Sequence, residues 1–311
     1  MNRIMKKNGK AATVLLALLV VALWGSLFPM IKIGYKAFQI NTGDIPSIVL
    51  FAGLRFTFSG ILLLCATVVG KRDTAKLAKS EIPMLLIGAL ATIILHYSFT
   101  YIGLALGEGS KSAIIKQIGF LFLACFAFVF DKTDRFSKRK AIAACLGFAG
   151  IIATAMDGTG ISLQLGDLLL LLASACSAIG AVISKRATQR ISPVKFVAYT
   201  QFIGGVFLLG AGILLGGRIT ALSPMSALLF LYICGASIGA YVLWNSLLKT
   251  GSISKLSIIK FTEPLFAVLF SGVLLGETIF KLSYLAALLL LLVALLVEHL
   301  PWRNHDDRND L

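Results

Sequence analysis

SKSAIIKQIGFLF at residues 110–122 and SKLSIIKFTEPLF at residues 254–266 are one pattern that occurs twice in this sequence, 144 positions apart. Ser, Lys, Ile, Ile, Lys, Leu and Phe recur in the same register. Each copy places a lysine, Lys116 or Lys260, a few residues inside a long apolar run. The repeat predicts two related halves, and the lysines raise the question of why a cation stands in an apolar run.

The composition predicts a membrane protein. The 311 residues are 58% hydrophobic and 14% charged, with a mean hydropathy of +0.91, whereas soluble domains carry about 25% charged residues. A membrane-spanning helix needs roughly 20 mostly apolar residues, and continuous runs of this kind argue against alternating β-barrel strands. We predict ten spans near residues 11–33, 46–69, 82–104, 112–130, 139–156, 166–185, 194–215, 225–248, 256–275 and 281–300.

The positive charges predict the topology. If the N-terminus is cytoplasmic, only four of the 29 Lys and Arg residues fall in outer loops, namely Lys36, Lys111, Arg218 and Lys281. This is the positive-inside bias, which places both termini in the cytoplasm and accounts for the net charge of +15 without a nucleic-acid partner. The basic start and first apolar run resemble a signal peptide but lack a clear cleavage site, so we expect an uncleaved first helix.

Further pairs extend the repeat. Tyr97 and Tyr241 are also 144 residues apart, and Arg55 has Gln201 at nearly the same offset. We therefore predict an all-α integral membrane protein with a first five-helix repeat (residues 1–156), a second (residues 166–300) and a cytoplasmic tail (residues 301–311). Because five is odd, the second repeat must insert upside down, and inverted repeats are typical of secondary transporters with a substrate site between the halves.

Three segments resemble a known family. WGSLFPMIK (residues 24–32), GDLLLLLASACSAIGAVISKRA (166–187) and FTEPLFAVLFSGVLLGET (261–278) resemble, in that order, the first helix, the start of the second repeat and the ninth helix of the EamA domain of the drug/metabolite transporter superfamily. The resemblance implies a ten-helix carrier that moves metabolites or drugs across the cell membrane, often outward, without a cofactor. Gly119 and Phe120 replace the helix-breaking pattern around Pro264, so the fourth helix is expected to be straighter than the ninth.

The charged residues within the spans are candidate functional groups, because a charge at the centre of a membrane helix costs about 2.5–3.5 kcal/mol or more. Lys116 and Lys260 lie about four residues, or roughly 6 Å, inside their helices, where a lysine can also extend to the interface as an anchor. Lys111 and Lys255 already stand at the boundary, and the recurrence in both halves favours a shared central path. We therefore predict that Lys116 and Lys260 line a cavity, with the anchor role as the alternative.

The two copies differ in their neighbours. Glu263 follows Lys260 by three residues, close enough to pair on a helix, whereas Lys116 is followed by Gln117 and has no carboxylate nearby. Two mechanisms remain open. In the first, Lys116 and Lys260, with Gln117 as a further substrate-binding residue, bind an anionic group of the substrate. In the second, Lys260 and Glu263 form a proton-coupled switch that changes partner between the inward and outward states. A purely structural pairing of Glu263 with Lys260 is the alternative to coupling.

Other polar residues are assigned more modest roles. We expect Arg55 to tie helices together by donating to backbone carbonyls, and Lys32 to extend to the interface. In the family, the counterparts of the spans that carry the aromatic and amide residues line the cavity, so the resemblance implies a substrate pocket with aromatic walls. Its candidate lining residues are Trp24, His96, Tyr97, Tyr241, Trp244 and Asn245.

The predicted function is a secondary transporter, in the export direction, of small anionic or zwitterionic metabolites such as amino acids. The alternative is a broad exporter of aromatic or drug-like amphiphiles, in which the lysines are structural. No GxxxxGK[ST] motif indicates a pump, and the scattered His, Cys and acidic residues do not indicate a metal site, a cofactor or a membrane enzyme. A non-transporting sensor is a further, weaker alternative. The expected partners are the bilayer, a small-molecule substrate and a coupled proton or other ion, and both a monomer and a homodimer remain open.

Overall fold

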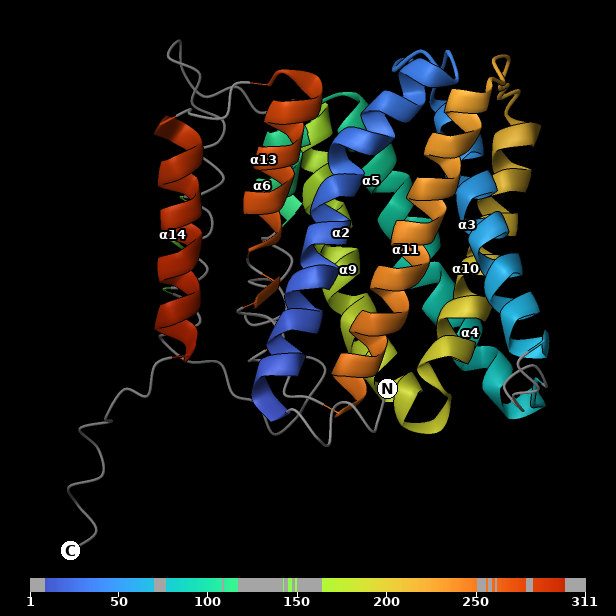
Figure 1. Ribbon diagram of the computed structural model, residues 1–311, viewed down its shortest axis with the longest axis horizontal. Helices are drawn as coiled ribbons and strands as arrows, with labels where there is room; N and C mark the ends of the chain where they lie inside the picture. The colour runs from blue at the N-terminus through green and yellow to red at the C-terminus, as the bar shows by residue number, and fades with distance from the viewer. Residues whose placement is uncertain are drawn as a thin grey trace, which may run out of the picture.

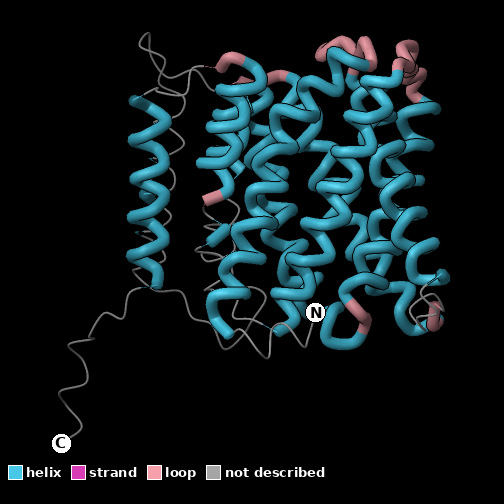
Figure 2. The backbone as a smooth tube through the Cα atoms, viewed as in Figure 1, coloured by secondary structure: helices cyan, strands magenta, loops and turns pink. Residues whose placement is uncertain are grey.

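The computed structural model describes residues 9–69, 77–107, 109–116, 164–250, 262–277 and 282–299, together with a few residues between these segments. Within them the protein is a bundle of upright helices without strands (Figures 1 and 2). The first half contributes α2 (Gly9–Ala37), α3 (Ile45–Val69), η2 (Lys79–Glu81), α4 (Ile82–Ala89), η3 (Leu90–Leu95), α5 (His96–Ala105) and α6 (Gly109–Lys116). The second half contributes α9 (Leu165–Arg190), α10 (Pro193–Leu214), α11 (Pro224–Thr250), α13 (Glu263–Leu275) and α14 (Leu282–His299).

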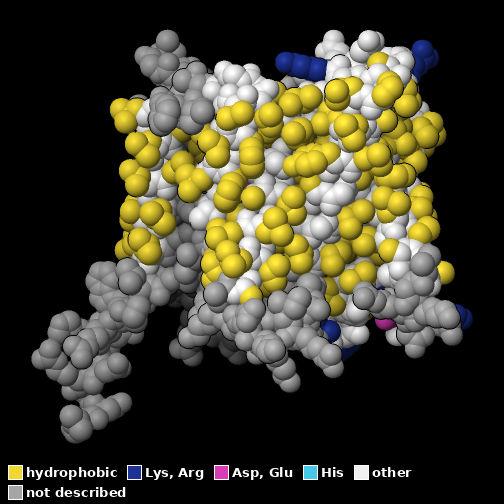
Figure 3. Space-filling view, in the orientation of Figure 1, with side chains coloured by type: hydrophobic (Ala, Val, Ile, Leu, Met, Phe, Trp, Pro, Cys, Tyr) yellow, Lys and Arg dark blue, Asp and Glu magenta, His cyan; other side chains and the backbone are white. Residues whose placement is uncertain are grey.

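The surface of the bundle is suited to a bilayer. Six of the described helical segments are long and apolar enough to span a membrane, from Ala12–Ala37 to Pro224–Lys249. Large hydrophobic side chains such as Phe207 and Leu214 point outward, and Figure 3 shows hydrophobic side chains over the flank of the bundle with lysines and arginines at its two rims. The burial pattern is thus that of a protein whose apolar exterior contacts lipid rather than water.

Helices α3 and α10 pack closely through small residues. A Cβ atom built on Gly53 would lie 2.2 Å from the Leu209 nitrogen, and one on Gly205 would lie 2.2 Å from the Thr57 nitrogen. Since position 53 meets 209 while position 57 meets 205, the two helices run antiparallel. Small residues allow backbones to approach in this way within membranes, and this contact joins the two halves of the chain.

The predicted span at residues 82–104 is a single membrane crossing with an irregular centre. Residues Lys79–Ala105 form one candidate span, in which η3 (Leu90–Leu95) is a π-helical segment between α4 and α5. π-Helical turns are rare and occur frequently at functional sites. No feature of the sequence predicted this one.

The ninth predicted span is interrupted. Residues 259–260 are helical, Thr262 is a turn, and α13 begins at Glu263 with Pro264 in its first turn. Proline lacks the N–H that a helix interior requires, so it is tolerated at a helix start. The break expected around Pro264 is therefore present, close to Lys260.

Most of two predicted spans, residues 117–130 and 139–156, lies outside the described residues, as do Gln117, Gly119 and Phe120. The ten-helix count, the inversion of the two halves and the straighter fourth helix therefore stay predictions.

Candidate functional site

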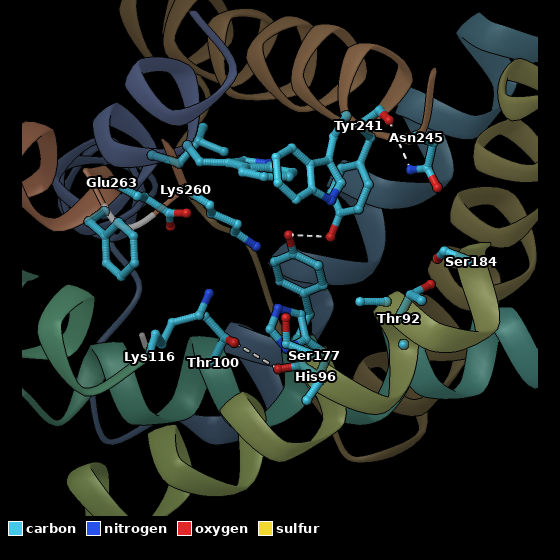
Figure 4. Close-up of a pocket in the computed structure, with 18 of the residues that line it drawn as sticks. Thr92, His96, Thr100, Lys116, Ser177, Ser184, Tyr241, Asn245, Lys260 and Glu263 are labelled. Carbon is cyan, nitrogen blue, oxygen red and sulfur yellow. Dashed lines mark hydrogen bonds between the residues drawn. The ribbon is translucent and has the colours of Figure 1, made fainter. Parts of the chain in front are cut away.

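A cavity of about 100 Å³ lies within the bundle, lined by residues of α2, α3, η3, α5, α6, α9 and α11 and by Lys260 and the start of α13 (Figure 4). Its volume is sufficient for several water molecules or a small solute. The lining combines apolar, aromatic and charged side chains from both halves. The polar and aromatic lining residues are Trp24, Phe28, Arg55, Thr92, His96, Tyr97, Thr100, Lys116, Ser177, Ser184, Tyr241, Trp244, Asn245, Lys260 and Glu263.

The structure brings together eight of the nine site residues predicted from the sequence. Lys116, Lys260, Glu263 and the aromatic and amide residues all line this one cavity, whereas Gln117 lies outside the described residues. The residues come from helices far apart in the sequence, so the cavity is a property of the assembled bundle.

The two lysines rest on aromatic rings. The Nζ atom of Lys116 lies 5.3 Å from the centroid of the Phe28 ring and 5.9 Å from that of Tyr97. The Nζ atom of Lys260 lies closer to its rings, 4.5 Å from the centroid of Trp24 and 5.2 Å from that of Trp244. A cation within about 6 Å of an aromatic face is attracted by the electrons of the ring, which partly offsets the removal of each ammonium from water.

Four polar atoms of the lining residues are buried without a hydrogen-bond partner. They are the donors Trp24 Nε1–H and Arg55 Nε–H and the acceptors Asn245 Oδ1 and Glu263 Oε2. Buried polar groups are nearly always hydrogen-bonded, and an unpaired one costs about 1–3 kcal/mol. Two donors and two acceptors around one cavity can be satisfied by a solute that carries complementary groups.

The repeat-related tyrosines meet each other. The hydroxyls of Tyr97 and Tyr241 are 2.6 Å apart and share a hydrogen bond. Asn245 donates through Nδ2 to the Tyr241 carbonyl, so Oδ1 is the amide atom that has no partner. Two residues 144 positions apart therefore contact each other across the two halves, and the two lysines at the same spacing line the same cavity.

His96 is held at the cavity wall by a contact with another helix. Its Nδ1 lies 2.8 Å from the Ala173 carbonyl oxygen of α9, and because a carbonyl can only accept, Nδ1 carries the hydrogen. The other ring nitrogen, Nε2, is then an acceptor in the neutral ring. Sequence reasoning named His96 only in passing and missed Thr92, Thr100, Ser177 and Ser184, since isolated hydroxyl residues in apolar helices carry no pattern that marks a lining position.

Two predictions about the remaining charges need correction. Arg55 does tie helices together, but its guanidinium donates to the side-chain hydroxyls of Tyr101 and Ser237 rather than to backbone carbonyls. Lys32 does not simply extend to the interface: its Nζ donates to the Gly107 carbonyl at 2.8 Å and pairs with Glu277 at 3.3 Å. The four partner residues could not be predicted from the sequence because they lie far along the chain from Arg55 and Lys32.

The predicted anchor Lys111 also has an ionic partner. Its Nζ lies 2.8 Å from Asp167 Oδ2, and Asp167 is almost fully buried at the start of α9. Asp167 also accepts from the Gln164 backbone N–H, which caps the helix. Lys111 therefore links α6 to α9 at the rim of the bundle.

An apolar bundle that encloses a charged and aromatic cavity has the architecture of a membrane transporter with a central solute site. The comparison with known proteins agrees with this class. The sequence matches the EamA-like transporter family over residues 11–156 and 164–298, and the chain belongs to that family.

Relatives along most of the chain are also transporters. The sequence is 32% identical to the uncharacterized transporter YvbV of Bacillus subtilis, over 94% of this chain and 92% of the relative. It is 27% identical to the uncharacterized inner membrane transporter YedA of Escherichia coli K12, over 88% and 87% of the two chains. It is also 27% identical to a probable amino-acid metabolite efflux pump of Salmonella typhimurium, over 89% and 91%. The protein is thus a multi-pass membrane transporter of the drug/metabolite type in the cell membrane.

The fold also occurs in a solved structure. One crystal structure superposes with a TM-score of 0.66 over 94% of this chain and 97% of that chain, at 18% sequence identity. At this identity the likeness concerns the helix arrangement alone.

Proposed function

We propose that this protein is a secondary exporter of small anionic or zwitterionic metabolites, with amino acids and related compounds as the leading class. The substrate crosses the membrane unchanged, by alternating access between two inverted halves that share the cavity. A coupled ion or the substrate gradient supplies the energy. The relative named as an amino-acid metabolite efflux pump supports both the class and the direction.

The observation that carries the proposal is the charge of the cavity. Its described lining holds three cationic side chains, Arg55, Lys116 and Lys260, against one carboxylate, Glu263. Three positive charges and one negative charge give a formal charge of +2. In a medium of low dielectric constant an excess of like charge is unfavourable, so an anionic group of a substrate would stabilise the occupied cavity.

A second candidate function rests on a different observation. Trp24 contacts Tyr241 and Trp244 with ring centroids 5.6 and 5.4 Å apart, and such aromatic clusters bind apolar, drug-like amphiphiles. In that case the two lysines are structural and their neutralisation leaves transport almost unchanged. The two functions therefore make opposite predictions for the same variants.

Glu263 is the proposed site of proton coupling. Its Oε2 atom is buried and has no hydrogen-bond partner, and it lies at the first residue of α13, just after the helix break. A carboxyl in this position can exchange a proton when the cavity changes its access, whereas a carboxylate held only for structure would be expected to have both oxygens satisfied.

The test begins with a thermal-shift screen of the purified protein against L-amino acids, organic anions, phosphorylated metabolites and aromatic cations. A ligand that binds the folded state at 100 times its Kd stabilises it by about 2.7 kcal/mol. Each hit is repeated with Lys116→Gln and Lys260→Gln, and with Lys36→Gln as the control, because Lys36 is exposed at the end of α2. Uptake of the labelled hit into proteoliposomes then measures transport.

We expect an anionic or zwitterionic hit whose affinity falls about tenfold or more in Lys116→Gln, because a hydrogen bond to a charged group contributes about 1.5–3 kcal/mol. Its affinity in Lys260→Gln should also differ from that of the wild type. The control should behave as the wild type. If only hydrophobic cations bind, or if Lys116→Gln and Lys260→Gln respond as Lys36→Gln does, the metabolite proposal is wrong and the amphiphile exporter replaces it.

A further inference from the structure

Lys260 occupies a cage of aromatic rings. Trp24, Tyr241 and Trp244, here called the indole cage, meet edge to face: Trp24 makes an interplanar angle of 76° with Tyr241 and 64° with Trp244. The Lys260 ammonium lies 4.5 Å from the Trp24 centroid and 5.2 Å from the Trp244 centroid. Both indoles are more than nine-tenths buried. Two indole rings thus lie within cation–π range of the Lys260 ammonium in a region that is shielded from water.

Aromatic cages of this kind bind ammonium groups of ligands, since the ring faces carry negative electrostatic potential and indole is the strongest of the aromatic side chains in this respect. The cage selects for charge and shape, so it does not distinguish the ammonium of a lysine from that of a solute. We propose that the indole cage is an ammonium-binding subsite, that Lys260 occupies it as a tethered substitute for the ligand, and that the ammonium group of a substrate displaces Lys260 when it binds.

The other lysine of the cavity provides an internal contrast. Lys116 lies over Phe28 and Tyr97 at 5.3 and 5.9 Å, farther from its rings and without an indole. Its contacts are those of a cation that partly offsets its own burial, not those of a cage. The two lysines are repeat-related in sequence, yet only Lys260 sits in the cage, and this difference assigns them different roles.

The surroundings of the cage accommodate both the displaced lysine and the rest of the substrate. Glu263, three residues after Lys260, has an Oε2 atom without a hydrogen-bond partner that can receive the displaced ammonium. The Trp24 Nε1–H is also unpartnered and can donate to a carboxylate beside the cage. A ligand with an ammonium on the ring faces and a carboxylate at the indole edge uses all of these groups.

The ligand class that follows is a small zwitterion with neighbouring ammonium and carboxylate groups. That this ligand is a transported substrate rests on the proposed export function. The ammonium-binding subsite itself can be tested without a transport assay. A purely anionic metabolite would leave Lys260 in the cage, so the proposal narrows the substrate class from anionic or zwitterionic to zwitterionic.

The experiment uses the intrinsic fluorescence of the cage. The sequence has three tryptophans, Trp24, Trp244 and Trp302, so Trp302→Phe leaves only the two cage indoles as reporters. In this background, Lys260→Ala empties the cage and Lys116→Ala is the matched control that removes the other lysine. The probes are methylammonium and tetramethylammonium chloride, with sodium chloride at equal ionic strength and tert-butanol as the neutral compound of similar shape.

The proposal predicts a saturable fluorescence change when the ammonium probes are added to Lys260→Ala. The midpoint concentration should be at least about tenfold lower than in Lys116→Ala or in the background protein, because the competing cation has been removed from the cation–π site. Sodium chloride and tert-butanol should give no saturable change. Equal titrations in the two lysine variants, an equal response to tert-butanol, or no saturable response in Lys260→Ala would each overturn it.

A second measurement in the wild-type protein removes any dependence on the folding of Lys260→Ala. Lysine acetylation by acetic anhydride is quantified by peptide mass spectrometry, with Lys116 as the internal reference. Tetramethylammonium should increase the labelling of Lys260 relative to Lys116, because the displaced amine leaves the cage. An unchanged ratio at saturating probe would contradict displacement. Failure here would leave the export function standing, whereas loss of flux with intact ammonium binding would refute the export function alone.

Discussion

The contact between α3 and α10 makes Gly205 one of the least replaceable small residues in the described part of the bundle. A Cβ at this position would lie 2.2 Å from the Thr57 nitrogen, 2.6 Å from the Phe56 carbonyl carbon and 2.8 Å from the Thr57 Cα. All three are backbone atoms, which cannot rotate away. Because real Cβ contacts are not closer than 3.0 Å, Gly205→Ala requires the helices to separate locally by at least 0.8 Å, the difference between 3.0 and 2.2 Å.

The steric cost of Gly205→Ala can be isolated with a matched control on the same helix, Gly210→Ala. A Cβ on Gly210 would meet no atom within 4 Å. Gly205→Ala and Gly210→Ala gain the same helix propensity, about 1 kcal/mol, so the difference between their free energies of unfolding isolates the steric term. Overpacking of this kind costs about 1–3 kcal/mol. We therefore expect Gly205→Ala to be less stable than Gly210→Ala by about 1–3 kcal/mol.

The assay is reversible unfolding in mixed micelles by titration with sodium dodecyl sulfate, followed by circular dichroism. The same separation would displace α3 near Arg55, two residues from Thr57, so ligand binding should also weaken in Gly205→Ala and not in Gly210→Ala. Equal unfolding midpoints for the two variants would refute the inferred helix contact.

Three further predictions concern single contacts. Tyr97→Phe should lower the free energy of unfolding by about 1 kcal/mol through loss of the hydroxyl contact with Tyr241, and a double-mutant cycle with Tyr241→Phe should give a coupling energy of similar size; additive effects would contradict the bond. Asp167→Asn should cost about 3 kcal/mol, measured by the same unfolding titration, because it leaves the largely buried Lys111 ammonium without its counter-charge; Asp167→Glu should retain part of that energy. Gly276→Ala should lower the free energy of unfolding by about 1 kcal/mol, because this helix-ending residue has the left-handed φ of 69°, which disfavours a side chain. A Cβ there would meet no atom within 4 Å, so the cost is conformational rather than steric; an unchanged thermal midpoint would argue against the left-handed turn.

Much of the fold was predictable because the chemistry of a bilayer is simple. Runs of apolar residues long enough to span the hydrocarbon can only be helices, and the described helices coincide with eight of the predicted spans. Helix breaks were predictable only where a residue enforces them. Pro264 predicted the start of α13, whereas nothing in the sequence of the π-helical segment Leu90–Leu95 predicted it; in the structure this segment packs against α9 and α10.

The candidate site was likewise only partly predictable from the sequence. The 144-residue spacing indicated in advance that Lys116 and Lys260, and likewise Tyr97 and Tyr241, are related positions. The spacing did not say toward which side each lysine turns, because a long side chain one helical turn inside a span reaches either the interface or the interior.

The sequence by itself determined the class of protein, its membrane location and the positions of the described spans, because each depends on composition or on the length of apolar runs along the chain. The tertiary structure alone decided which side chains meet. Lys260 lies against Trp24, which is more than two hundred residues away, and Lys32 pairs with Glu277. Such partners are chosen by the packing of whole helices, and no local pattern in the sequence records that choice.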